Sequence, residues 1–168
     1  EPSLVLLPAR ITIPAGQPSA SVPVAVVDDG DVNGSRVVSI GAFGLASGSG
    51  ARVVEAVPAV LTVTDDDGPA LRLRVSPTLV REGLNPAATL TVSRNTAATA
   101  SLVVQLTSND ESEARVPVSV TLPAGVSSMD VPVVSISDQT SDGNQAVVLS
   151  AAAPGHAGAA VTLTVSDQ

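Results

Sequence analysis

The sequence contains two copies of one pattern at a fixed spacing, and this repeat constrains the fold more than any other feature. The segment Ile-Thr-Ile-Pro-Ala-Gly at residues 11–16 is matched by Val-Thr-Leu-Pro-Ala-Gly at 120–125, 109 positions later. The same spacing, without a gap, aligns three further features: Val-Pro-Val at 22–24 with 131–133, Asp29 with Asp138, and Gly34 with Gly143. Near the end of each copy the spacing is 102 positions, because Leu-Thr-Val-Thr-Asp at 61–65 matches Leu-Thr-Val-Ser-Asp at 163–167. Internal repetition of this kind predicts an array of similar structural units.

Short runs of Val, Ile, Leu and Thr alternate with clusters of Pro, Gly, Asp, Asn and Ser, which predicts strands and turns rather than helices. Strands are expected at residues 10–13, 21–27, 36–40, 60–64, 71–75, 88–93, 102–107, 118–122, 129–136, 145–151 and 160–165. Within several of these runs, apolar and polar residues alternate, as in a sheet with one face in a core and the other in water. The predicted fold class is therefore all-β, with tandem antiparallel β-sandwiches.

The two copies are unequal in extent. Glu1 aligns with Asp110, so the first copy has no counterpart to roughly residues 70–109, which we expect to supply the opening strands of the second. The expected domains are residues 1–67, a sandwich truncated at its N-terminal strands, and residues 68–168, a complete sandwich. The sequence as given is expected to be a piece of a longer protein.

Composition excludes several classes of function. The 168 residues include no Cys, Trp or Tyr, one Phe and one His, which excludes a disulfide framework, a zinc–thiolate site and an aromatic sugar-binding platform. Asp and Glu number 16 against 8 basic residues, for a formal net charge of −8, and such a chain repels the phosphate backbone of nucleic acids. No apolar run reaches the roughly 18 residues that a membrane-spanning helix requires.

In several places the residues resemble the Calx-beta family, first named for the calcium-binding domains of sodium–calcium exchangers. These are the strand and turn at 12–16, echoed at 121–125, the strand ending at 27–29, and the closing Leu-Thr-Val-Thr-Asp-Asp-Asp at 61–67. In the second copy, Val-Arg-Glu-Gly at 80–83 followed by Ala-Thr-Leu-Thr-Val at 88–92 resembles the opening hairpin of the family. The resemblance is to tandem copies in large bacterial surface or secreted proteins. It implies immunoglobulin-like sandwiches, often with calcium at the loop tips.

Two acidic segments of the first copy are candidate calcium ligands. They follow predicted strands and comprise Asp28, Asp29, Asp31, Asp65, Asp66 and Asp67. Calcium binds several carboxylate oxygens on flexible loops, and the family topology would bring these segments to one tip. The alternative is that the first segment is ordinary turn chemistry and the second a solvated linker. Two departures from the family pattern weigh against this site: the acid of the opening strand is missing, and Ser35-Arg36 stands where Glu is common.

The second copy offers a second set of candidate ligands. These are Glu82, Asp110, Asp138, Asp142 and Asp167. This set also departs from the family pattern, because Ser137 replaces one Asp of a pair and Gln145 stands near a position where Glu is common.

The sequence contains no pattern typical of an enzyme. His156 lies in a Pro-Gly-His-Ala-Gly loop, and no Gly-x-Ser-x-Gly, His-Glu-x-x-His or phosphate-binding glycine loop is present. Phe43 is expected to fill a local gap in the core.

Two functions from different classes fit these observations. The leading prediction is a non-catalytic spacer in a large bacterial protein at the cell surface or outside the cell, stiffened by calcium and contacting neighbouring repeats of the same protein. The alternative is a calcium-dependent interaction or adhesion module, in which another chain adds strands to the truncated first unit. An ancillary domain of a secreted hydrolase is a third alternative.

Overall fold

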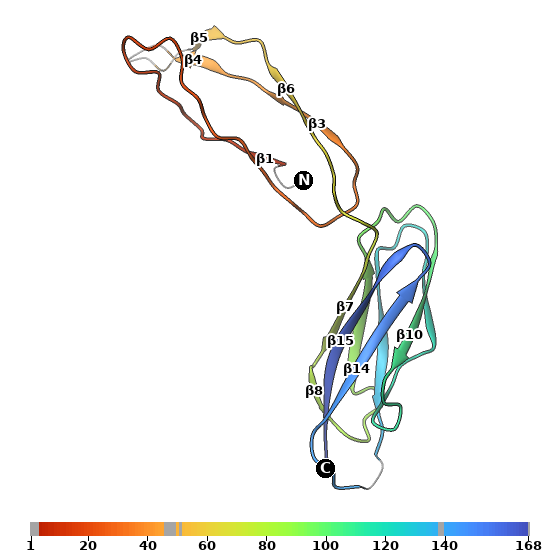
Figure 1. Ribbon diagram of the computed structural model, residues 1–168. Coiled ribbons are helices and arrows are strands. Elements are labelled where there is room, and N and C mark those ends of the chain that lie inside the picture. Colours follow the sequence, from red (N-terminus) through yellow and green to blue (C-terminus); the bar gives the residue numbers. More distant parts are fainter. Residues whose placement is uncertain (1–3, 46–49, 51, 138–139, 168) are drawn as a thin grey trace. The chain divides into compact units, whose positions relative to one another are not determined.

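The computed structural model describes residues 4–167 except 46–49, 51 and 138–139, and its described residues form strands and turns without a helix. The chain divides into two compact units (Figure 1). The first unit comprises Glu1–Gly30 and Gly34–Asp66, and the second comprises Asp31–Asn33 and Asp67–Gln168. Asp31–Asn33 belongs to the second unit because the backbone amide of Val32 donates to the carbonyl of Asn95.

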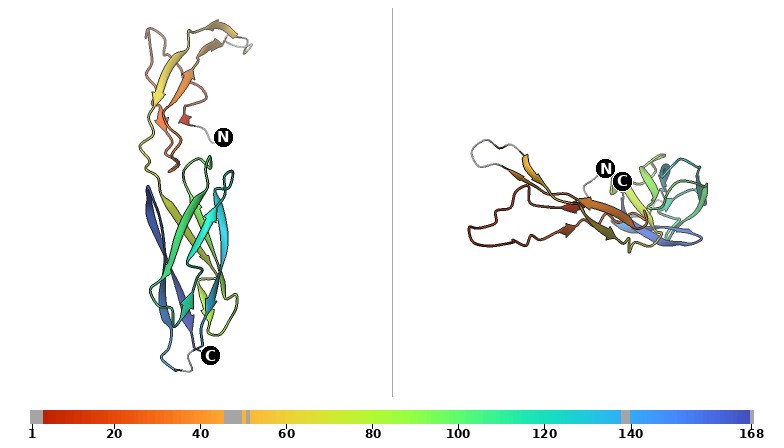
Figure 2. Two further views of the ribbon diagram at one scale, coloured as in Figure 1. Left: turned by 90° about the vertical axis from the view of Figure 1, so that its right-hand side faces the viewer. Right: turned by 90° about the horizontal axis from the view of Figure 1, so that it is seen from above.

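The second unit is a β-sandwich of two sheets (Figure 2). One sheet contains, in spatial order, β12 (Ser119–Leu122), β10 (Leu102–Ser108), β14 (Gln145–Ala153), β15 (His156–Ser166) and β8 (Leu79–Arg81). The other contains β11 (Ala114–Arg115), β13 (Ser128–Ser135), β9 (Ala88–Arg94) and β7 (Leu71–Ser76). All neighbours are antiparallel except β15 and β8, which run parallel.

The core of the second unit follows from the period-two alternation of its strands. In β9, for example, Leu90 and Val92 are fully buried, while Thr89 of the same strand faces solvent. Both sheets contribute to one apolar cluster, whose most deeply buried members are Leu90, Val92, Val104, Leu122, Val133, Val147, Leu149, Leu163 and Val165. Burial of each such side chain contributes about 1.5–3 kcal/mol, so this cluster is the main source of stability.

The described residues of the first unit form three strand pairs. β1 (Val5–Leu6) pairs with β2 (Ala25–Val26), β3 (Arg36–Ile40) with β6 (Ala59–Val63), and β4 (Phe43–Leu45) with β5 (Arg52–Glu55). None of its residues whose burial is described is fully buried. Many apolar side chains are therefore left in contact with water.

Two strand pairs of the first unit, β3–β6 and β1–β2, repeat the register of the second. We call residues related by the spacing of 109 or 102 positions equivalent. Arg36 lies opposite Val63 in the β3–β6 pair, and the equivalent Gln145 lies opposite Val165 in the β14–β15 pair. The β1–β2 pair likewise repeats the register of the β11–β13 pair. The repeat seen in the sequence is thus a repeat of backbone structure.

One strand predicted in the first unit is absent and another is shortened. Residues 10–13 form no strand, and of residues 21–27 only β2 pairs. The physical reason is visible in the second unit, where the equivalent β12 pairs with β10 and β13 pairs with β9. The described part of the first unit has no equivalents of β7–β10, so these segments lack the neighbours that would complete their hydrogen bonds.

We predict that one pair of equivalent positions differs sharply in its effect on stability. Leu122→Ala should lower the free energy of unfolding of the second unit by about 2–5 kcal/mol, because Leu122 is 0% exposed. Ile13→Ala at the equivalent position should cost about 0.5 kcal/mol or less, because Ile13 is 51% exposed. Urea unfolding curves of both variants test this, and equal losses would contradict the difference in burial.

Candidate metal centre

Three carboxylates of the second unit converge where β8 and β15 end. One oxygen from each of Glu82, Asp142 and Asp167 lies within 4.8 Å of the others. Because β8 and β15 are parallel, with Arg81 opposite Ser166, the residues that follow them leave the sheet together. The amide of Glu82 donates to the carbonyl of Ser166 at 3.1 Å, which fixes Glu82 beside Asp167.

Asp142 reaches the same place through the loop that precedes β14. Its neighbour Gly143 has φ of +82°, a left-handed conformation that favours glycine. The backbone amide of Gly143 donates to Oδ2 of Asp167 at 2.8 Å, and the hydroxyl of Ser141 donates to the same atom at 3.4 Å. These bonds to Asp167 hold the loop, and with it Asp142, against the end of β15.

The three side chains differ in their exposure. Glu82 is only 5% exposed, Asp167 is half-buried and Asp142 is exposed. The Oδ1 atom of Asp167 is buried and accepts no hydrogen bond from the described residues. Three carboxylates this close repel one another, and a cation among them would relieve that repulsion. Carboxylate oxygens are the ligands that hard cations prefer.

Of the two remaining candidates of the second unit, only Asp110 is described, and it is not part of this group. Asp138 lies outside the described residues. Asp110 turns back on its own loop, where its Oδ1 accepts hydrogen bonds from the backbone amide and the hydroxyl of Ser112. The hydroxyl of Ser112 is the main cause that holds the pKa of Asp110 below its ordinary value, and the backbone amides of Ser112 and Glu113 add to it.

The candidates of the first copy are divided between the two units. Asp31 and Asp67 belong to the second unit, where Asp31 forms an exposed ion pair with Arg72 at 3.3 Å. In the first unit, Asp29 Oδ2 lies 3.0 Å from the guanidinium of Arg36, and Asp28 and Asp66 are exposed. No three carboxylates of the described first unit come as close together as Glu82, Asp142 and Asp167. The six-carboxylate site stays a prediction.

Both units have the same hydrogen bond from a loop glycine to the aspartate that follows the last strand of the copy. Asp65 Oδ2 accepts a hydrogen bond from the amide of Gly34 at 2.6 Å, as Asp167 accepts from Gly143. Gly34 also has a positive φ, of +73°. The sequence aligned these residues, but Asp65 was expected as a metal ligand or as part of a solvated linker, and Asp167 as a metal ligand. Neither was expected to close a turn. The signal was present, because Gly and Asp recur together in both copies.

The ring nitrogens of His156 lie 3.2 Å from the hydroxyl of Thr96 and 3.1 Å from the carbonyl of Pro154.

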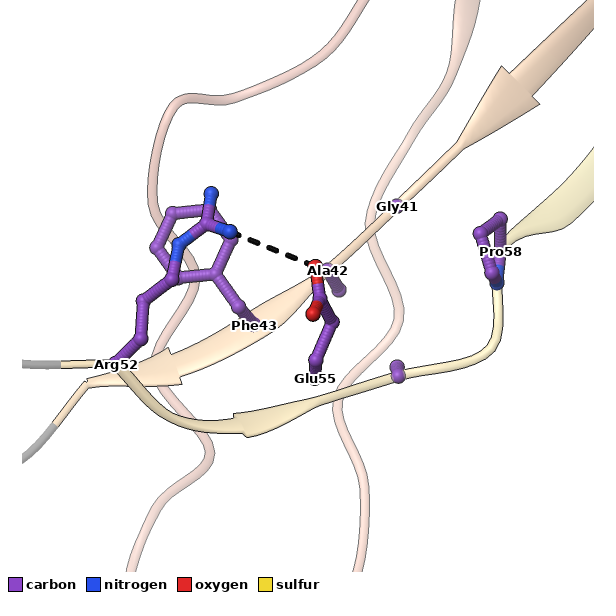
Figure 3. A pocket seen from close by; sticks show the side chains of 7 residues that line it. Gly41, Ala42, Phe43, Arg52, Glu55 and Pro58 are labelled. Atoms are coloured by element: carbon purple, nitrogen blue, oxygen red, sulfur yellow. Dashed lines mark hydrogen bonds and ion pairs between the residues drawn. The ribbon is translucent and has the colours of Figure 1, made fainter.

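Phe43 was expected in a core gap but is 47% exposed, because the first unit has no described buried core. The guanidinium of Arg52 lies over its ring at 3.7 Å and 3.4 Å from Glu55 (Figure 3). Phe43, Arg52 and Glu55 are among the residues that line a shallow hollow of about 230 Å³.

No helix capable of crossing a membrane occurs among the residues that the structure describes.

We predict that Ser112→Ala raises the pKa of Asp110 towards its ordinary value, because the variant loses the hydroxyl that donates to the carboxylate. A lowered pKa in the folded state stabilises the fold above the unfolded-state pKa, and this contribution is lost as the pH falls through the folded-state pKa. The variant should therefore lose less stability on acidification. Carboxyl NMR titration measures the shift, with Ser101→Ala as an exposed control, and an unchanged titration of Asp110 would contradict the assignment.

No family model and no curated protein sequence matches the chain. The solved structures that are similar to it include the following three. The apo form of the Calx CBD1 domain has a TM-score of 0.43 and 15% identity, and the match covers 59% of this chain and 98% of that one. A glycosyl hydrolase family 2 member from Bacteroides cellulosilyticus has a TM-score of 0.47 and 12% identity, and the match covers 86% of this chain but 18% of that one. Domains 4 and 5 of the S-layer protein SbsC have a TM-score of 0.36 and 19% identity, with 65% and 58% covered. All three are likenesses of fold alone.

Proposed function

We propose that the chain is a non-catalytic structural repeat, a spacer in a large bacterial protein at the cell surface or outside the cell, whose second unit binds calcium through Glu82, Asp142 and Asp167. The observation that carries the calcium proposal is the convergence of these three carboxylates within 4.8 Å. Neighbouring repeats of the same protein are the proposed partners, and the sandwich is proposed to be Calx-beta-like.

Several properties of the three carboxylates support a cation between them. The carboxylate of Glu82 is buried and lies next to two further acids, so the three negative charges repel one another. Asp167 has one buried oxygen that no described residue uses. Calcium takes six to eight oxygen ligands in flexible geometry, so backbone carbonyls and water would complete a set begun by three carboxylates. A bound calcium would supply positive charge and cross-link three segments.

The place of the three carboxylates suits a spacer. They come from the end of β8, the loop before β14 and the residue that follows β15, so a cation held by all three would tie the end of one sheet together. Stiffening of that end would limit local opening where the chain leaves the sandwich. Weak calcium sites are typical of extracellular modules, where calcium is abundant, which supports a location outside the cell.

The repeated backbone supports a structural rather than a catalytic role. The two units share strand register and turn contacts, as expected of an array in which each copy performs the same mechanical task. The ring nitrogens of His156, the single histidine, contact a hydroxyl and a turn carbonyl, which is the surrounding of a side chain that anchors a loop.

We predict that calcium stabilises the second unit. At a free calcium concentration 100 times its dissociation constant, binding to the folded state alone adds about 2.7 kcal/mol to the free energy of unfolding. Calorimetric melts of the full chain in calcium and in chelator measure the shift, and magnesium at the same concentration tests selectivity.

A charge-matched pair of variants locates the site. Asp142→Asn should abolish most of the calcium shift without disturbing the fold, because Asp142 is exposed. Asp130→Asn should keep the full shift, because Asp130 lies on β13 and contacts Thr91 instead of the cluster. The proposal fails if the unmodified chain shows no shift or if both variants respond equally.

A further inference from the structure

The apolar positions of the first unit match the core positions of the second but are not buried. Val133 is 0% exposed, whereas its equivalent Val24 is 41% exposed, and Leu122 and Ile13 differ in the same way. Because the sequence keeps an apolar residue at these positions in both copies, the difference in burial arises from what covers them.

The β3–β6 pair gives the same result at four further positions. In the second unit the equivalent side chains are 0–1% exposed, whereas in the first unit all four are only partly buried. The four positions of the first unit are Val38, Ile40, Leu61 and Val63, equivalent to Val147, Leu149, Leu163 and Val165. We call these four residues together with Ile13 and Val24 the acceptor face.

In the second unit, β7–β10 provide what the acceptor face lacks. β10 pairs on one side with β12 and on the other with β14, β9 pairs with β13, and β8 pairs with β15. The same four strands contribute Leu71, Val75, Val80, Leu90, Val92, Val104 and Leu106 to the core. They therefore supply both the missing strand neighbours and the second layer.

A polar contact adds specificity to this arrangement. The buried guanidinium of Arg94 in β9 donates to the carbonyl oxygens of Pro123 and Val126 at 3.2 and 2.8 Å. The first unit already has the same turn, since the amide of Gln17 donates to the carbonyl of Pro14 at 3.0 Å as Val126 does to Pro123 at 3.1 Å. The first unit thus already has the carbonyl oxygens to which an arginine equivalent to Arg94 would donate.

We propose that the acceptor face docks a neighbouring segment of the same protein, a four-stranded polypeptide with the apolar alternation of β7–β10 and an arginine at the position of Arg94. The third strand of this segment would pair along residues 19–24, as β9 pairs with β13. Its fourth strand would insert between residues 10–13 and residues 40–43, as β10 lies between β12 and β14. In the second unit β10 runs into β11 through residues 109–113 alone. A donor joined to β1 in the same way has a high effective concentration, which favours a segment of the same protein over another chain.

The test is a fusion in which a second copy of residues 70–109 precedes Glu1 of the full chain, because Glu1 is equivalent to Asp110. Hydrogen exchange of amides 36–40 and 59–63 should slow by about tenfold or more, and binding of a hydrophobic dye to the chain should fall. The melting transition of the second unit, recorded in the same samples, should be unchanged and shows that the fusion folds.

Two further samples make the result decisive. The same fusion with Leu90→Asp and Val104→Asp in the added copy should leave exchange of the first unit fast. The unmodified chain mixed with separate polypeptide 70–109 should show much weaker protection at equal concentration. The proposal is overturned if the intact fusion leaves exchange unchanged or if the substituted copy protects equally well. It is also overturned if the separate polypeptide protects as fully as the fused one, which would identify another chain as a sufficient donor.

Discussion

A strand with alternating apolar residues buries them only when a second layer covers that face, and both units of this protein depend on that constraint. In the second unit, two sheets cover one another, and Leu90 of one sheet belongs to the same buried cluster as Leu149 and Leu163 of the other. In the first unit, the β3–β6 pair has the register of the β14–β15 pair but no covering sheet among its described residues. Register is thus set by local pairing and turn chemistry, whereas burial is set by strands distant in the sequence.

The acidic cluster depends on the same closure. Glu82 lies beside Asp167 because β8, one of the opening strands of the second unit, pairs in parallel with β15. In the first unit, Asp65 keeps the contact with Gly34 that Asp167 makes with Gly143. The first unit therefore forms this turn without the opening strands, but its described residues include no carboxylate equivalent to Glu82.

The sequence was sufficient to predict the fold class, most strands and the repeat, because these follow from period-two alternation and from turn residues that act locally. It was misleading for residues 10–13, where the alternation is present but the neighbouring strand is not. It also could not separate Asp110 from Asp142, since both lie in polar loops. Only the three-dimensional pairing decides that the first turns towards Ser112 and the second towards Asp167.

The two copies also show that a shared backbone does not imply a shared binding site. Asn33 stands at the position of Asp142, and Arg36 at the position of Gln145. The first copy therefore lacks the carboxylate equivalent to Asp142, and the guanidinium of Arg36 already lies 3.0 Å from Asp29. Completing the first unit with strands like β7–β10 would restore its core and a position equivalent to Glu82, but it would not restore this charge. Attraction for a divalent cation depends on the charges of the site, so the calcium site proposed for Glu82, Asp142 and Asp167 need not recur at the equivalent positions of the first copy.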